Sequence, residues 1–160
     1  QLELEPGRYL VANAGLLVAE VRAVKTVAKN HFVLLYAGFN DLARPILYGS
    51  HHDIAFVTPS GAAVEGATRP VAVAGPLCES GDVFTQKDGG YVEFRDLPLP
   101  APGDFALIRD AGAYGAAMSS NYNTRPLAPE VMLDGEDLSV IRRRQSVEQL
   151  LALEHGAEEI

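Results

Sequence analysis

Short hydrophobic runs broken by glycine- and proline-containing turns recur along most of the chain. Residues 16–24 partly alternate hydrophobic and polar side chains, as a half-buried strand does, and a strong strand follows at 31–36 after a turn at Lys29-Asn30. The same criteria predict an opening strand at 2–4 and further strands at 52–57, 70–74, 82–85 and 105–110. The prolines within 97–104 exclude a central strand there, because proline has no N–H to donate to a neighbouring strand.

The last third of the chain adds a hairpin and a helix. Asp134-Gly135 separates two hydrophobic runs, 128–133 and 138–144, and is typical of a turn between strands. The run Ser146-Val147-Glu148-Gln149 matches a capping box, so we expect a helix that buries Val147, Leu150 and Leu151.

Two other short helices are predicted before that hairpin. Asp41 is placed to cap one that runs through Tyr48, with Pro45 in its first turn, and the other ends near Ser119. With about seven to nine strands and three short helices, the pattern predicts a mainly β fold, a β-barrel or sandwich with small helical insertions. We find no internal boundary and expect a single domain over residues 1–160.

Composition narrows the class of protein. A hydrophobic content of 48% with 21% charged residues is typical of a globular domain. The net charge of -8 argues against a nucleic-acid partner, since phosphate binding needs a basic face, and the hydrophobic runs are too short for a membrane span. A single cysteine excludes an internal disulfide, and with no secretory leader in the sequence we expect a cytoplasmic protein.

That cysteine lies in the loop 75–82, the stretch whose side chains are best suited to catalysis. Cys78 is followed at once by Glu79, and the glycines and Pro76 fix a turn that presents both side chains in a set direction. A thiol is a useful proton donor or nucleophile because its pKa lies close enough to neutrality to be tuned. The alternative is a buried cysteine beside a solvated glutamate.

Three further stretches combine cations, phenols and small residues. Glu5-Pro6-Gly7-Arg8 places a guanidinium, which can bond two oxygens of an anion, after a rigid turn; an ordinary surface turn with an ion pair is the alternative. Arg44 and Tyr48 share one face of the predicted helix and could bind an anion together, or simply form an amphipathic turn. Tyr114, flanked by glycine and alanine, could approach a ligand closely or anchor the core.

Adjacent histidines at 51 and 52, followed by Asp53, raise the question of a metal site. Neighbouring residues of a strand point to opposite faces, and the sequence offers no second cluster of ligands. We therefore expect no metal site here, and no glycine-rich phosphate loop is present either.

Taken together, these motifs resemble the C-terminal part of the diaminopimelate decarboxylases, within the fold-type III pyridoxal-phosphate decarboxylases. The resemblance runs from Glu5 to about Arg144 and includes the Asn-Asp and Arg-Pro pairs at 40–45, Leu47-Tyr48, the loop 75–82 and the run 118–126. Tyr36 and Phe39 depart from the family pattern, which usually has an acid and a methionine there.

The resemblance implies a lyase that uses pyridoxal phosphate to convert meso-diaminopimelate into L-lysine and carbon dioxide, in lysine biosynthesis. It implies that Glu5 faces the pyridine nitrogen of the cofactor, and that Pro6, Gly7, Arg8 and Tyr114 line the cofactor site. It further implies that Arg8, Arg44, Tyr48 and Tyr114 bind the substrate. Cys78 would return a proton to the substrate carbon, and Glu79 would bind the distal amino group, both serving the partner subunit of a homodimer.

The family also carries an N-terminal barrel domain, which holds the cofactor on a lysine. Lys25, Lys29 and Lys87 match no such motif, and the sequence starts at Gln1 within the predicted opening strand. We therefore expect residues 1–8 to be the end of a missing barrel domain, and the isolated chain to be inactive. The alternatives are a non-catalytic β-domain that acts as a binding or dimerisation module, or part of a decarboxylase for another diamino acid.

Overall fold

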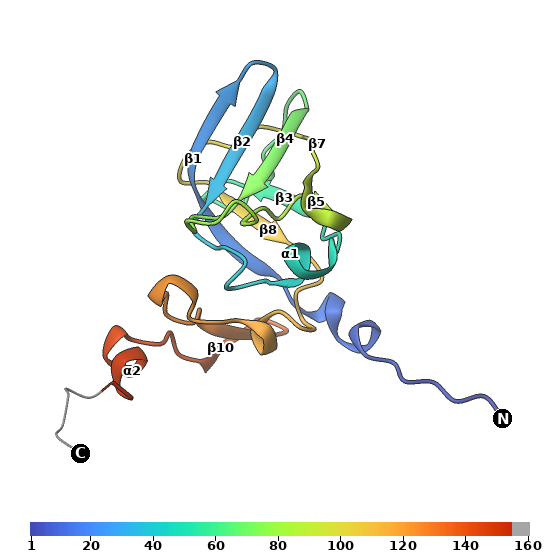
Figure 1. Ribbon diagram of the computed structural model, residues 1–160, viewed down its shortest axis with the longest axis vertical. Helices are drawn as coiled ribbons and strands as arrows, with labels where there is room; N and C mark the ends of the chain where they lie inside the picture. The colour runs from blue at the N-terminus through green and yellow to red at the C-terminus, as the bar shows by residue number, and fades with distance from the viewer. Residues whose placement is uncertain (155–160) are drawn as a thin grey trace. The chain divides into compact units, whose positions relative to one another are not determined.

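The computed structural model describes residues 1–154, and its contacts cluster into two compact units, 1–119 and 120 onward (Figure 1). The sequence pattern did not indicate this division. In the first unit the strands are β1 (Leu17–Val27), β2 (Asn30–Leu35), β3 (Ile54–Val57), β4 (Arg69–Ala74), β5 (Gln86–Lys87), β6 (Tyr91–Val92), β7 (Arg95–Leu97) and β8 (Phe105–Ile108). One α-helix, α1 (Arg44–Tyr48), and four 3-10 turns complete it: η1 (Arg8–Leu10), η2 (Ala12–Ala14), η3 (Asp88–Gly90) and η4 (Ala116–Met118).

A six-stranded sheet in the order β3-β8-β1-β2-β4-β7 organises the first unit, and β5 and β6 form a separate small hairpin. The long strand β1 pairs with β8 through its first residues and with β2 through the rest. A register shift between Val21 and Ala23 falls near this change of partner, where a bulge lets a strand bend and twist. The sheet therefore curves in the barrel-like manner that the sequence predicted (Figure 1).

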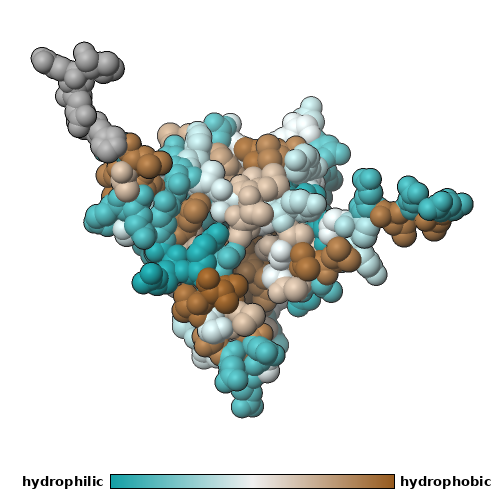
Figure 2. Space-filling view, turned by 90° about the horizontal axis from the view of Figure 1, so that it is seen from below, coloured by the Kyte–Doolittle hydropathy of each residue, from teal (hydrophilic) through white to brown (hydrophobic). Residues whose placement is uncertain are grey.

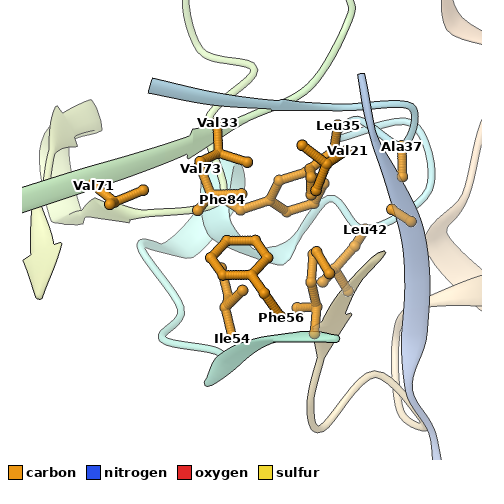
Figure 3. Packing of buried hydrophobic residues seen from close by; sticks show 13 residues of the cluster. Val21, Val33, Leu35, Ala37, Leu42, Ile54, Phe56, Val71, Val73 and Phe84 are labelled. Carbon is orange, nitrogen blue, oxygen red and sulfur yellow. The ribbon is translucent and has the colours of Figure 1, made fainter. Parts of the chain in front are cut away.

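The core lies inside this curved sheet. Side chains from β1, β2, β3, β4 and β8 meet there with Leu42 and Phe84 from the connecting loops (Figure 3). Val21, Val33, Leu35, Val71 and Val73 are fully buried, so alternate residues of neighbouring strands face one interior. At about 25 cal/mol per Å² of apolar surface buried, such a core is the main source of stability.

The strand predictions at 16–24, 31–36, 52–57, 70–74 and 105–110 are confirmed by β1, β2, β3, β4 and β8. The predicted strand at 82–85 is wrong: only Val83 bridges Ala74, and the segment is otherwise irregular. The predicted opening strand at 2–4 is also wrong, because residues 1–7 have no secondary structure and Leu2 is 84% exposed. Figure 2 shows this segment at the right of the view, where hydrophilic and hydrophobic surface alternate.

Helix α1 begins later than predicted. Its N-cap is Ala43, without a side-chain cap, and Pro45 lies in the first turn as expected. Asp41 accepts a hydrogen bond from the N–H of Gly38 instead (3.1 Å), so its carboxylate closes the preceding turn rather than capping the helix.

The second unit contains η5 (Tyr122–Thr124), the hairpin β9 (Glu130–Asp134) and β10 (Asp137–Arg142), and α2 (Val147–Leu151). Both the hairpin and the capping box of Ser146 with Gln149 are confirmed. The expectation that α2 buries Val147 and Leu151 is wrong, since Val147 is 51% exposed. Its five residues make less than two turns, too short to bury a continuous face.

Candidate functional site

The centre of the candidate site is a guanidinium held between two phenol rings. Arg44, at the start of α1, lies over the rings of Tyr48 and Tyr114, with its Cζ 5.1 and 5.4 Å from the ring centroids. Arg44 also donates from Nη2 to the hydroxyl of Ser50 (3.1 Å), while its Nε is buried without a partner among the described residues. Both rings are about half exposed, so this face is open to a ligand.

Tyr114 is held by an unusual backbone. Its φ is 57°, and the preceding loop lies against η2 through hydrogen bonds from Ala111 N to Gly15 O and from Gly112 N to Ala12 O, each 3.0 Å. A Cβ on Gly112 would collide with the carbonyl oxygen of Val11, so this approach of two backbones requires glycine. The sequence showed small residues here, and the structure gives the reason.

The turn that carries Arg8 meets the same tyrosine. A Cβ on Gly7 would lie 2.7 Å from Tyr114 Oη, so the phenol hydroxyl lies directly against this backbone. Arg8 is half-buried, and its Nε and Nη2 are buried without a partner among the described residues. Buried N–H groups in native proteins are nearly always satisfied, so these donors are set to receive an acceptor from a ligand.

His52, in the loop before β3, lies near both arginines. Its imidazole is 1% exposed, and Nδ1 is 2.8 Å from the carbonyl oxygen of Arg109. Burial is the main cause that lowers the pKa of His52, and the charges of Arg8 and Arg44 lower it further, against the opposing Arg109 carbonyl and Asp110 carboxylate. His52 is therefore neutral at neutral pH. His51 beside it is exposed, as expected for neighbours on opposite faces.

A buried carboxylate shapes the cysteine loop. Asp82, 3% exposed, accepts from Leu77 N at Oδ2 and from Phe39 N at Oδ1, each at 2.8 Å. The first bond fixes the residue before Cys78, and the second ties the loop to the turn that leads into α1. Gly75 packs against the same carboxylate, where a Cβ would collide with it. The sequence assigned Asp82 no role in the loop; the only signal available there was an acid directly after Gly81, and its burial is seen only in the structure.

Cys78 and Glu79 lie apart from the arginines. Cys78 is a free, exposed thiol, and Glu79 accepts from Ser80 Oγ and Gly81 N within its own loop, each at 3.2 Å. Across residues 1–154, no hydrogen bond, ion pair or ring contact joins either side chain to Arg8, Arg44, Tyr48 or Tyr114. The structure thus brings together four of the predicted substrate-binding residues and leaves the cysteine loop separate.

The remaining residues that the sequence singled out make few contacts. Glu5 and Pro6 lie exposed in the irregular N-terminal segment. Tyr36, one departure from the family pattern, is 52% exposed and lies under the guanidinium of Arg22, 5.8 Å from its ring centroid. The described residues contain no group of three or more possible metal ligands and no helix long and apolar enough to cross a membrane.

Known proteins match this fold and these motifs. Residues 8–112 match the family described as the C-terminal sheet domain of the pyridoxal-dependent decarboxylases. The diaminopimelate decarboxylase of Escherichia coli K12 is 57% identical over 155 residues, which are 96% of this chain and 37% of that protein. The chain thus spans about a third of the length of the curated relatives it matches.

Solved structures agree. A crystal structure of diaminopimelate decarboxylase superposes with a TM-score of 0.88 at 56% identity, covering 92% of this chain and 35% of that one. The enzyme of Helicobacter pylori, complexed with L-lysine, superposes with a TM-score of 0.79 at 39% identity, over 93% of this chain and 34% of that one. The family match, the sequence identity and the superposition lead to one conclusion: the chain belongs to the pyridoxal-dependent decarboxylase family and represents its C-terminal sheet domain.

Proposed function

We propose that this chain is the C-terminal part of a diaminopimelate decarboxylase, which converts meso-diaminopimelate into L-lysine and carbon dioxide, and that it supplies the anion-binding half of the active site. The observation that carries this proposal is Arg44, held between the rings of Tyr48 and Tyr114 with a buried N–H left without a partner. A planar guanidinium in a fixed orientation suits a carboxylate, because its fork can bond two oxygens at once. The relatives that match over nearly the whole chain bear this enzyme's name.

The residues present fit pyridoxal 5'-phosphate. Arg8 offers buried N–H groups without partners, and the Tyr114 hydroxyl lies against the backbone of Gly7. Together they form a donor-rich surface of the kind that a phosphate requires. When bound, the cofactor supplies an electron sink for the bond that loses carbon dioxide. We propose that Glu5, Pro6, Gly7, Arg8 and Tyr114 line its site, with Glu5 at the pyridine nitrogen.

The substrate end follows from the same cluster. Arg44 and Tyr48, with Arg8, hold the distal carboxylate of the substrate, and Tyr114, whose ring lies against the Arg44 guanidinium, reaches both the cofactor phosphate and the substrate. Once the distal carboxylate is held, the reacting carbon at the other end of the substrate takes a fixed position. Binding energy is used in this way to orient the substrate.

Cys78 and Glu79 act at a different site from the arginines of their own chain. We propose that Cys78 gives a proton to the substrate carbon in the partner subunit of a homodimer, and that Glu79 binds the distal amino group there. Their separation from the arginine cluster and the exposure of the thiol support this arrangement. The lysine that holds the cofactor belongs to an N-terminal barrel domain, the second partner of this chain.

A chimera tests the proposal. This chain replaces the C-terminal 155-residue match of the Escherichia coli relative, and the product is assayed for cofactor absorbance, dimer formation and lysine release from meso-diaminopimelate. We expect lysine release, and a rate reduced about 100-fold or more by Cys78→Ala, the usual contribution of a positioned proton donor. Ser139→Ala, at an exposed position of β10 away from the cysteine loop, is the control and leaves the rate within about threefold.

Three results would count against this function or its assigned residues. A dimeric chimera that binds the cofactor without releasing lysine refutes the substrate, and release of a product from another diamino acid identifies the alternative enzyme. A Cys78→Ala chimera with the rate of the parent chimera refutes the role of the thiol. Without the barrel, the purified chain forms no borohydride-trappable adduct with pyridoxal phosphate at a single lysine.

A further inference from the structure

His52 has two ring nitrogens in different surroundings. Nδ1 faces the carbonyl oxygen of Arg109 at 2.8 Å, and a carbonyl only accepts, so Nδ1 carries the proton. In the neutral ring Nε2 is then a hydrogen-bond acceptor. Nε2 is buried and has no partner among the residues that the structure describes.

The unpaired groups nearby are donors. Arg8 has a buried Nε and a buried Nη2 without partners, and Arg44 has a buried Nε without one. Both guanidinium charges act on the His52 imidazole, Arg8 more strongly than Arg44. The buried Nε2 of His52 is thus an acceptor close enough to be affected by the charges of Arg8 and Arg44. The buried N–H groups of these two arginines have no acceptor among the described residues.

The backbone around His52 is fixed independently of the arginine cluster. Arg95 donates from Nη1 to the His52 carbonyl oxygen (2.6 Å) and from Nε to Glu93 (2.9 Å), while Arg109 N donates to Asp53 O (2.9 Å). Held at its main chain and at Nδ1, the imidazole presents Nε2 in a single direction. A group so constrained is suited to orient a neighbouring side chain.

We propose that His52 is a positioning residue for anion binding: its neutral Nε2 accepts a hydrogen bond from the Arg8 guanidinium when the cluster holds an anionic ligand, which leaves the remaining N–H groups of Arg8 directed at that ligand. This inference rests on the proposed anion-binding role of Arg8. It assigns His52 no contact with the ligand itself. A charged histidine would be a third cation among Arg8 and Arg44 and could accept nothing at Nε2.

Two substitutions of His52 test the roles of its two ring nitrogens separately. His52→Asn places an amide near Nδ1, so it keeps the donor to the Arg109 carbonyl and loses the Nε2 acceptor. His52→Gln reaches the Nε2 position, so it keeps the acceptor and loses the donor. His51→Asn, at the exposed neighbouring histidine, is the matched control.

The test measures binding rather than turnover alone. In the chimera with the Escherichia coli barrel, freed of cofactor, the Kd for pyridoxal 5'-phosphate and the KM for meso-diaminopimelate are determined for all three variants, together with their melting temperatures. We expect His52→Asn to weaken binding about tenfold or more, as for a lost hydrogen bond to a charged group, with kcat changed less than KM. His52→Gln restores binding to within about threefold of the parent while it melts at a lower temperature, and His51→Asn changes neither.

A purely structural histidine gives a different pattern. Binding that falls equally in both His52 variants, or in neither, overturns the proposal. Nitrogen NMR of the purified 160-residue chain adds a direct check: we expect the neutral Nδ1–H form in the folded chain at pH 7, and the Nε2–H form overturns the inference. A chimera that binds the cofactor but does not act on diaminopimelate refutes the proposed substrate, whereas the binding comparison still decides the role of His52.

Discussion

Replacing Asp82 by asparagine removes one of the oxygens around which the cysteine loop is built. In the native chain each carboxylate oxygen accepts a backbone N–H, from Leu77 and from Phe39, at 2.8 Å and in a buried site. Asparagine keeps one acceptor and turns its NH2 group toward the other N–H. One charge-assisted bond is lost, and a buried donor faces a donor.

The magnitude follows from those two effects. A hydrogen bond to a charged group contributes about 1.5–3 kcal/mol, and a buried N–H left unsatisfied costs about 1–3 kcal/mol. The two contributions overlap, because the N–H left unsatisfied is the donor of the lost bond, so they do not add in full. We therefore expect the free energy of unfolding to fall by about 2–4 kcal/mol. Against a total of about 5–15 kcal/mol, the variant still folds.

Urea unfolding followed by circular dichroism measures this difference directly. Asp96→Asn is the matched control, since it makes the same chemical change at an exposed carboxylate in β7, and it is expected to change stability by less than about 0.5 kcal/mol. A fall in the free energy of unfolding below about 1 kcal/mol in Asp82→Asn, or one equal to that of Asp96→Asn, refutes the conclusion that the Asp82 carboxylate stabilises the cysteine loop.

Two further predictions concern Gly112 and His52, which lie beside the arginine cluster. Gly112→Ala should lower stability by about 1–3 kcal/mol, because its Cβ collides with the Val11 carbonyl oxygen; an unchanged melting temperature contradicts that contact. Stability should also fall as the pH drops below about 6.5, the pKa of histidine in the unfolded chain, since the lowered pKa of His52 makes the unfolded state bind more protons. The loss approaches about 1.4 kcal/mol per pH unit while folded His52 stays neutral, and His52→Asn should remove this component when urea unfolding at pH 7.5 and 5.5 is compared; an identical pH dependence in the variant contradicts it.

Hydrophobic periodicity was sufficient to predict the strands that pair on both sides. β1, β2, β4 and β8 contribute fully buried residues, and their runs of valine, leucine and isoleucine carry that signal. The segment 2–4 also alternates hydrophobic and polar residues, but it has no partner strand among the described residues, so its pattern predicted a strand that did not form. Pairing is a property of the whole fold, which a local pattern does not contain.

The site was predictable as a set of residues but not as an arrangement. Arg44 and Tyr48 share a face in any helix, whereas the approach of Tyr114 depends on backbone contacts between η2 and the loop at 111–112. The separation of Cys78 from the arginines depends likewise on the three-dimensional course of the chain. The sequence raised His52 only as a possible metal ligand, which we did not expect it to be. Its position near Arg8 and Arg44, with Nδ1 on the Arg109 carbonyl, is set by contacts between distant segments that no local pattern contains.

The parallel pairing of β2 with β4 affects how the chain must fold. Parallel neighbours need a long crossover, and here that connection carries Arg44, Tyr48 and His52 between the two strands. Contacts of such large sequence separation form slowly, because a long loop must close before they contribute stability. The connection that carries Arg44, Tyr48 and His52 closes only when β4 pairs with β2, so we expect these three residues to reach their native positions late in folding rather than at its start.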